Sequence, residues 1–365
     1  MRFTRFGSVA AVAVAATLLL SSCAANEEAA PSDETSESAS TLSGTFAGSG
    51  ASSQGSAQEA WVKEFQTANP EVTINYDPAG SGTGRSAFIA GGVAFAGSDS
   101  VLSDDELAGE FGSCVPGTGA IDLPVYISPI AVIFNVEGVD ALNLDAATIA
   151  NIFKGEITTW NDAAIVALNP DADLPAATIT AVHRSDDSGT TKNFADYLGK
   201  VAPEVWDAEA EDAFPYTGGE AAQGTSGVVE AVKNGTNTIG YADASKADGL
   251  GVAAIKVGEN FVDYTAEAAA LVVDASPAVE GREDNDIAIA LDRTTTEDGA
   301  YPLVLVSYII TCNEYLDETD AQFVKEYIGY VASEQGQADA AEAAGAAPIS
   351  AELSARVATS IEAIK

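Results

Sequence analysis

Residues 44–100 read GTFAGSGASSQGSAQEAWVKEFQTANPEVTINYDPAGSGTGRSAFIAGGVAFAGSDS. Alternating and β-branched residues in this stretch predict short strands at residues 44–47, 72–76 and 93–96. Apolar residues recur at helical spacing between the strands, which predicts helices at residues 56–67 and 85–90. A strand that is repeatedly followed by a helix is typical of an α/β sheet, so we expect the α/β fold class.

The rest of the chain continues this alternation. Two long β-rich runs are predicted at residues 121–136 and 302–310, and Ser103 with Glu106 forms a capping box that opens a helix. Further strands are predicted at residues 178–184, 238–241 and 251–257. Further helices are predicted at residues 144–153, 193–201, 226–233, 264–273, 321–335 and 351–364. About 320 residues of this kind suit one large domain or two.

Three loops share one design, in which a strand end is followed by serine, threonine and glycine and then by a helix. They cover residues 48–53, 80–84 and 185–191. Ligands of open α/β sheets bind beyond the carboxyl ends of the strands. A helix N-terminus offers unpaired N–H groups and partial positive charge, glycine permits close approach, and hydroxyl groups add donors. Each loop alone fits an ordinary turn and helix cap better than an anion site, but the repetition of the design indicates an anion site.

Two charged residues follow the strands at these loops. Arg184 ends a strand and can pair bidentately with an oxyanion, although it also fits an ordinary surface arginine. Asp99 follows the third strand, where a carboxylate suits an anion only if that anion carries a proton. Phosphate keeps a P–OH near neutral pH and sulfate has none, so Asp99 would select phosphate. The alternative for Asp99 is a helix N-cap.

These loops and the residues around them resemble the signature loops of a known protein family. GSGASS (48–53), GSGTG (80–84), SDSVLSD (98–104) and RSDDSGT (184–190) are similar to the signature loops of PstS, the phosphate-binding component of the phosphate ABC transporter. The likeness runs from about residue 42 to the C-terminus with the motif order kept. It implies a periplasmic-binding-protein fold of type II, with two α/β lobes joined by two crossover strands and the ligand in the cleft. It also implies a binding protein that is not an enzyme and has no cofactor.

The resemblance further implies the phosphate ligands, residue by residue. They are Ser52, Ser53, Ser81, Asp99, Arg184, Ser188, Gly189 and Thr190, and Asp186 is expected to orient the guanidinium of Arg184. Three positions depart from the family pattern. Ser52 stands where threonine is common, Ser53 where phenylalanine is common, and Asp187 where glycine is common. Asp187 adds a second carboxylate near Arg184, which bears on the affinity more than on the identity of the ligand.

The lobes implied by the family divide the chain after its N-terminal segments. Lobe I would take residues 43–125 and 303–365, and lobe II would take residues 126–302. The crossovers would fall at residues 126–134 and 303–310, inside the two β-rich runs. Ligand that bridges both lobes would favour a closed state.

The N-terminus predicts export and a lipid anchor. Residues 1–22 contain two arginines and then an apolar run from about residue 9 to residue 20, which is typical of a signal peptide. The run ends in Leu-Ser-Ser before Cys23, and this resembles the lipobox of bacterial lipoproteins, in which the cysteine carries a diacylglycerol and acyl chains such as palmitate. We therefore expect anchoring at the extracytoplasmic face of the cell membrane through residues 23–42, an acidic tether. The alternative is a plain secretory signal with an incidental cysteine.

Charge and cysteine content exclude several classes of protein. The net charge of −39 argues against nucleic acid as a partner and should repel anions at long range, so an anion site must overcome it locally. Cys114 and Cys312 are an even pair in an exported chain, which favours a disulfide over two buried thiols. His183 is the one histidine and neither CxxC nor HExxH occurs, so we expect no metal site.

We therefore expect a monomeric binding protein that delivers inorganic phosphate to the permease subunits of an ABC importer. The alternatives are a binder of another oxyanion (phosphonate, sulfate or molybdate), a secreted hydrolase and a structural surface lipoprotein. Residues 79–86 (AGSGTGRS) nearly match a P-loop, but arginine replaces the lysine that such a loop requires. A serine hydrolase would depend on His183, because the chain contains no GxSxG motif.

Overall fold

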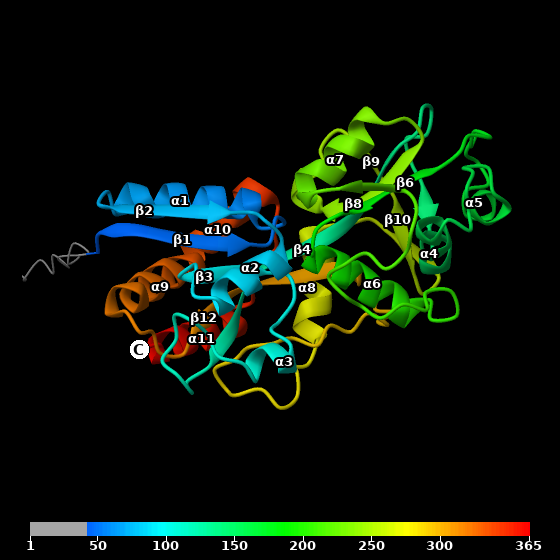
Figure 1. Ribbon diagram of the computed structural model, residues 1–365. Helices are drawn as coiled ribbons and strands as arrows, with labels where there is room; N and C mark the ends of the chain where they lie inside the picture. Colours follow the sequence, from blue (N-terminus) through cyan, green and yellow to red (C-terminus); the bar gives the residue numbers. More distant parts are fainter. Residues whose placement is uncertain (1–41) are drawn as a thin grey trace, which may run out of the picture. The chain divides into compact units, whose positions relative to one another are not determined.

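A computed structural model describes residues 42–365, and it contains one long mixed sheet (Figure 1). The nine-stranded sheet has the order β2-β1-β3-β12-β4-β8-β6-β7, and β9 pairs with β4 beside this path. Its strands are β1 (Gly44–Gly50), β2 (Val72–Asp77), β3 (Phe95–Ser98), β4 (Ala120–Asn135), β6 (Thr180–Arg184), β7 (Glu220–Ala222), β8 (Thr238–Asp243), β9 (Gly251–Val252) and β12 (Val304–Cys312). The α/β fold class predicted from the sequence is confirmed.

Strand β4 belongs to both halves of the sheet. Up to Pro129 it pairs antiparallel with β12, and from Ile130 it pairs antiparallel with β8. We call the part built on β1, β2, β3 and β12 lobe I, and the part built on β6, β7 and β8 lobe II. The change of partner falls within residues 126–134, the range expected for the first crossover. Because β4 is buried from residue 120 to residue 134, its apolar side chains supply core to both lobes.

Lobe I covers its sheet with helices from both ends of the chain, coloured blue to cyan and orange to red in Figure 1. Phe46 of β1 stacks on Phe323 at 3.9 Å between ring centroids, and this contact joins the two distant segments. The capping box of Ser103 and Glu106 is present as predicted. The helices are α1 (Gly55–Ala68), α2 (Ser81–Ile89), α3 (Asp104–Leu107), α9 (Glu318–Val331), α10 (Glu334–Ala344) and α11 (Ala351–Ala363).

Lobe II packs an aromatic cluster between its sheet and its helices. Phe194 stacks on Tyr241 with ring centroids 4.2 Å apart, and Phe153 meets Phe194 edge-on at 4.9 Å. A small second sheet has the order β11-β10-β5, formed by β5 (Asn143–Leu144), β10 (Ala254–Val257) and β11 (Asn260–Val262). The helices are α4 (Ala146–Lys154), α5 (Ala163–Leu168), α6 (Gly189–Val201), α7 (Gly224–Asn234), α8 (Ala266–Ala275) and the 3₁₀ turn η1 (Ala244–Lys246).

Two helices begin about one turn earlier than the sequence pattern predicts. Helix α2 starts at Ser81 and α6 at Gly189, inside segments that were expected to be loops. The Ser188 side chain caps α6 by accepting from the N–H of Thr191 at 3.2 Å. Gly80 precedes α2 with φ of 107°, a conformation that favours glycine. The small residues therefore form the first helical turns rather than flexible loops.

The predicted helix at residues 321–335 is confirmed as far as Val331, where α9 ends, but a second helix occupies the rest of this region. Helix α9 ends at Val331, and Ser333 caps α10 by accepting from the N–H of Gly336 at 3.1 Å. Helix α10 then continues to Ala344 through an alanine-rich segment that has too few large apolar residues to show a clear period.

Residues 282–287 contact lobe I, although this segment was expected in lobe II. Ile287 donates its N–H to the carbonyl of Asp122 at 2.9 Å. Arg282 donates to the carboxylates of both Asp122 and Asp286, at 3.3 and 2.8 Å. Burial and the charge of Asp286 raise the pKa of Asp122, against the opposing charge of Arg282. The segment thus forms a buried charged cluster with the lobe I end of β4.

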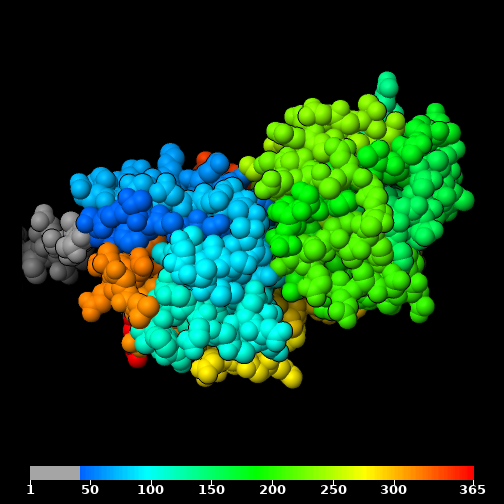
Figure 2. Space-filling view, viewed as in Figure 1, coloured from blue at the N-terminus to red at the C-terminus, as the bar shows by residue number. Residues whose placement is uncertain are grey.

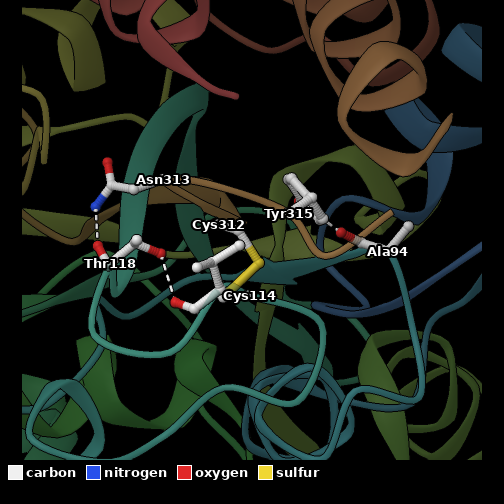
Figure 3. The surroundings of a disulfide bond; sticks show 7 residues. Ala94, Cys114, Thr118, Cys312, Asn313 and Tyr315 are labelled. Atoms are coloured by element: carbon white, nitrogen blue, oxygen red, sulfur yellow. Dashed lines mark hydrogen bonds between the residues drawn. A yellow bond between two sulfur atoms is a disulfide. The ribbon is translucent and has the colours of Figure 1, made fainter. Parts of the chain in front are cut away.

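Cys114 and Cys312 form the expected disulfide, with Cα atoms 5.2 Å apart (Figure 3). The bond joins the loop before β4 to the end of β12, and both cysteines are buried in lobe I. Hydrogen bonds reinforce the junction, including one from the Asn313 side chain to the Thr118 carbonyl at 2.8 Å. The signal peptide, Cys23 and nearly all of the tether lie outside the described residues. Within residues 42–365, no helix is long and apolar enough to cross a bilayer.

Candidate functional site

The structure gathers the predicted ligands at the carboxyl ends of β1, β3 and β6. Most of them are buried, since Ser53, Ser81, Asp99, Arg184, Ser188 and Thr190 are each at most 3% exposed. Helices α1 and α2 of lobe I and α6 of lobe II begin at this place. Figure 2 shows cyan-coloured residues of lobe I against green-coloured residues of lobe II, and the N–H of Gly82 in α2 donates to the carbonyl of Asp187 at 3.1 Å. The site is therefore built from both lobes.

The carboxylate of Asp99 is the centre of a hydroxyl cluster. Its Oδ1 accepts from Ser53 at 2.5 Å and from Ser307 at 2.6 Å, and its Oδ2 accepts from Thr190 at 2.9 Å. Burial raises the pKa of Asp99 overall, although these three hydrogen bonds and the charge of Arg184 act in the opposite direction. Because both oxygens of Asp99 accept from hydroxyl donors, these hydrogen bonds favour its ionised form.

The two lobes approach each other closely at Gly189. A Cβ atom there would lie 2.7 Å from the Cβ of Asp99 and 2.7 Å from Oγ of Ser81. Asn193 adds a second contact by donating from Nδ2 to the carbonyl of Asp99 at 2.7 Å. Glycine is thus required where α6 begins, because a side chain would push α6 away from β3.

Arg184 is held by a half-buried carboxylate in lobe II. Its Nε donates to Oδ1 of Asp186 at 2.8 Å, and its Nη2 donates to Oδ2 of the same residue. Asp186 also accepts from the N–H of Gly224 at 2.9 Å. Burial would raise the pKa of Asp186, but the hydrogen bonds and charge of Arg184 outweigh it, so the pKa is lowered. Asp186 thus orients the guanidinium, in the place that the family resemblance implied.

The three positions that depart from the family pattern have different surroundings. The Ser52 hydroxyl lies 3.0 Å from that of Thr225 and accepts from the N–H of Thr225 at 3.1 Å, at the start of α7. Ser53 supplies one of the donors to Asp99. The Asp187 side chain is exposed, and its carbonyl accepts from the N–H of Gly82 at 3.1 Å across the lobes.

Sequence reasoning missed two parts of the site. Ser307 lies on β12, 208 positions from Asp99 along the chain, and no motif marks it. Arg85, which is the arginine of the P-loop-like segment, forms an ion pair with Asp212 at 2.5 Å and with Glu106 at 2.9 Å. Since Arg85 belongs to lobe I and Asp212 to lobe II, this pair connects the lobes rather than binding a nucleotide.

This arrangement can hold a protonated oxyanion between the lobes. Arg184, the hydroxyl groups and the helix N-termini offer donors to anionic oxygens. Asp99 offers an acceptor to an O–H of the ligand. Within residues 42–365, no group of three or more histidine, cysteine, aspartate or glutamate side chains is placed to hold a metal ion.

Comparison with known proteins places the chain in a family. A family model described as a PBP superfamily domain matches residues 35–335. The chain is 36% identical to the phosphate-binding protein PstS 3 of Mycobacterium tuberculosis, over the full length of both proteins. The chain belongs to the PstS family. It is also 33% identical, again over both full lengths, to PstS 2 of the same organism, another member of the PstS family named as a phosphate-binding protein.

Solved structures support the same fold. A high-affinity periplasmic phosphate-binding protein, PfluDING, superposes with a TM-score of 0.69 at 21% identity. The match covers 87% of this chain and 93% of that protein. The PstS-like, periplasmic-binding-protein fold expected from the sequence is therefore confirmed.

Proposed function

We propose that this chain binds inorganic phosphate outside the cytoplasm and delivers it to the membrane subunits of a phosphate ABC importer. The observation that carries the proposal is Asp99, a buried carboxylate placed among hydroxyl donors and opposite Arg184. A site for a fully deprotonated anion would have no use for such a carboxylate, because it would repel the ligand. Phosphate can donate a P–OH to Asp99 while Arg184 and the helix N-termini bind its other oxygens.

Binding of another oxyanion is the main alternative. A phosphonate also carries a proton near neutral pH, so competition between ligands decides between it and phosphate. Sulfate and molybdate lack that proton, and Asp99 disfavours them. A serine hydrolase needs a histidine nitrogen that can accept a proton from a serine hydroxyl. The ring nitrogens of His183 instead face backbone carbonyl oxygens, those of Arg184 and Gly218, at 2.9 and 3.0 Å, so a hydrolase is disfavoured. We therefore infer a binding role without catalysis.

Titration calorimetry with the Asp99→Asn variant tests this proposal. Wild-type protein stripped of ligand should bind phosphate and give no heat with sulfate. Asp99→Asn should weaken phosphate binding by about 10- to 100-fold, because one charge-assisted hydrogen bond contributes about 1.5–3 kcal/mol. It should also bind sulfate measurably, since the amide can donate to a sulfate oxygen.

Asp105→Asn is the matched control for that experiment. It makes the same change in net charge on lobe I, but the Asp105 side chain is exposed on α3. Its phosphate and sulfate affinities should stay close to those of the wild type. Absence of phosphate binding by the wild type would overturn the proposed function.

We further propose that the chain acts as a monomer held at the extracytoplasmic face of the membrane through a lipid on Cys23. Cys23→Ala should release the protein from the membrane fraction into the medium, because acyl chains would supply the anchor. Cell fractionation followed by immunoblotting measures this, with Cys114→Ala as a control that keeps Cys23. Retention of the Cys23→Ala variant on the membrane would show that another element anchors the chain.

A further inference from the structure

The hydroxyl of Ser307 reaches Asp99 from a strand that the sequence motifs do not include. Ser307 is fully buried on β12, and its Oγ lies 2.6 Å from Oδ1 of Asp99. The pairing of β12 with β4 shifts between Ser307 and Tyr308, where the structure has a β-bulge or a similar irregularity. Such irregularities often re-aim side chains beside functional sites.

A chain of buried side chains sets the direction of this hydrogen bond. Gln54 donates from Nε2 to Oγ of Ser307 at 2.7 Å and to the carbonyl of Tyr308 at 3.0 Å. Since a carbonyl only accepts, the amide nitrogen must face it. The Oε1 atom of Gln54 accepts from Gln58 at 2.9 Å, and Gln58 accepts from the Tyr327 hydroxyl at 2.7 Å. The hydroxyl hydrogen of Ser307 is therefore directed to Asp99.

This fixed donor acts differently on the two protonation states of Asp99. An ionised carboxylate gains from every donor that it accepts, whereas a proton on Oδ1 would face the hydrogen of Ser307. The Ser53 hydroxyl, which also donates to Oδ1, can rotate away to relieve such a conflict. The Ser307 hydroxyl has less freedom, because the bond from Gln54 to its oxygen holds its hydrogen toward Asp99.

We propose that Ser307 is a positioning residue that keeps Asp99 ionised in the closed site and so preserves discrimination against fully deprotonated oxyanions in mildly acidic surroundings. The proposal rests on the proposed function. A protonated Asp99 would donate to sulfate instead of repelling it. Ser307 thereby sets how far the pH can fall before the site accepts sulfate.

The Ser307→Ala variant tests the proposal through a pH profile. Purified full-length protein, stripped of ligand, is titrated with sodium phosphate and separately with sodium sulfate between pH 4.5 and 8. At pH values above the pKa of Asp99 in both proteins, Ser307→Ala should bind sulfate about tenfold more tightly than the wild type, which corresponds to a rise of about one unit in that pKa. The two sulfate affinities should converge as the pH falls and Asp99 becomes protonated in both. Phosphate affinity should change less than sulfate affinity, because phosphate keeps its own proton donor.

Two further variants separate this role from a structural one. Thr311→Val removes a fully buried hydroxyl from the same strand, one that has no hydrogen-bond partner, and should leave both profiles unchanged. Ser307→Cys retains a weak donor of similar size, so it should shift the sulfate profile in the same direction by less. It also serves if Ser307→Ala does not fold.

A double variant decides whether Ser307 acts through Asp99. In an Asp99→Asn background the side chain at position 99 can no longer ionise, so adding Ser307→Ala should not alter sulfate affinity further. An effect that persists in that background would overturn the inference. So would identical sulfate profiles for the wild type and Ser307→Ala. If the wild type binds no phosphate, the proposed function itself fails, which is a distinct result.

Discussion

Arg184→Ala is expected to weaken phosphate binding roughly 100- to 1,000-fold, because it removes a buried cation that faces the anion from lobe II. Arg184→Lys should retain part of the affinity, since it keeps the charge but loses the planar fork that binds two oxygens at once. Calorimetry or competition with a fluorescent phosphate reporter measures both variants. Arg356→Ala, on the exposed surface of α11, is the control and should bind as the wild type does.

Arg184→Ala should also lower the free energy of unfolding. Asp186 would remain as a half-buried carboxylate without its partner, which costs about 1–3 kcal/mol. Adding Asp186→Asn removes that uncompensated charge, so the double variant should regain much of the lost stability but none of the phosphate affinity. If affinity returns together with stability, Arg184 supports the fold rather than the ligand. If Arg184→Ala loses less than tenfold in affinity, Arg184 is not a principal phosphate ligand.

Replacing Cys114 and Cys312 by alanine should lower the free energy of unfolding by about 3–5 kcal/mol. The two cysteines lie 198 positions apart, and a cross-link that closes so long a loop removes much conformational entropy from the unfolded chain. Phosphate affinity should stay within about threefold of the wild type. Backbone hydrogen bonds beside the disulfide, such as the one from Val115 to Glu314 at 2.8 Å, hold the junction without it.

Urea unfolding followed by tryptophan fluorescence measures this change in stability. Wild-type protein in reducing buffer should unfold at the same urea concentration as the double alanine variant. Cys23→Ala keeps the disulfide, so it should match the oxidised wild type and respond to reduction in the same way. An unfolding midpoint that is unaffected by reduction would contradict the prediction.

Local patterns in the sequence were sufficient for the fold class and the chemistry of the candidate site. The strand-loop-helix order of residues 44–100 depends on periodicity and small residues, which act over a few positions. Arg184 and Asp186 are two positions apart, so their ion pair could be expected from neighbouring residues alone. The disulfide could be expected too, because only two cysteines remain after Cys23.

Tertiary structure decided the features that join distant segments. Ser307 and Asp99, or Arg85 and Asp212, lie far apart in the chain, and a hydrogen bond between them leaves no local pattern in the sequence. Packing also decided that residues 282–287 contact lobe I and that the small-residue loops are first turns of helices. The ionisation of Asp99 depends on burial and on donors from three separate strand ends and helices, so only the folded chain determines it. The sequence by itself determined which chemical groups are present and the order in which strands and helices alternate. The fold determined which donor faces which acceptor, because those contacts form only when the lobes are packed.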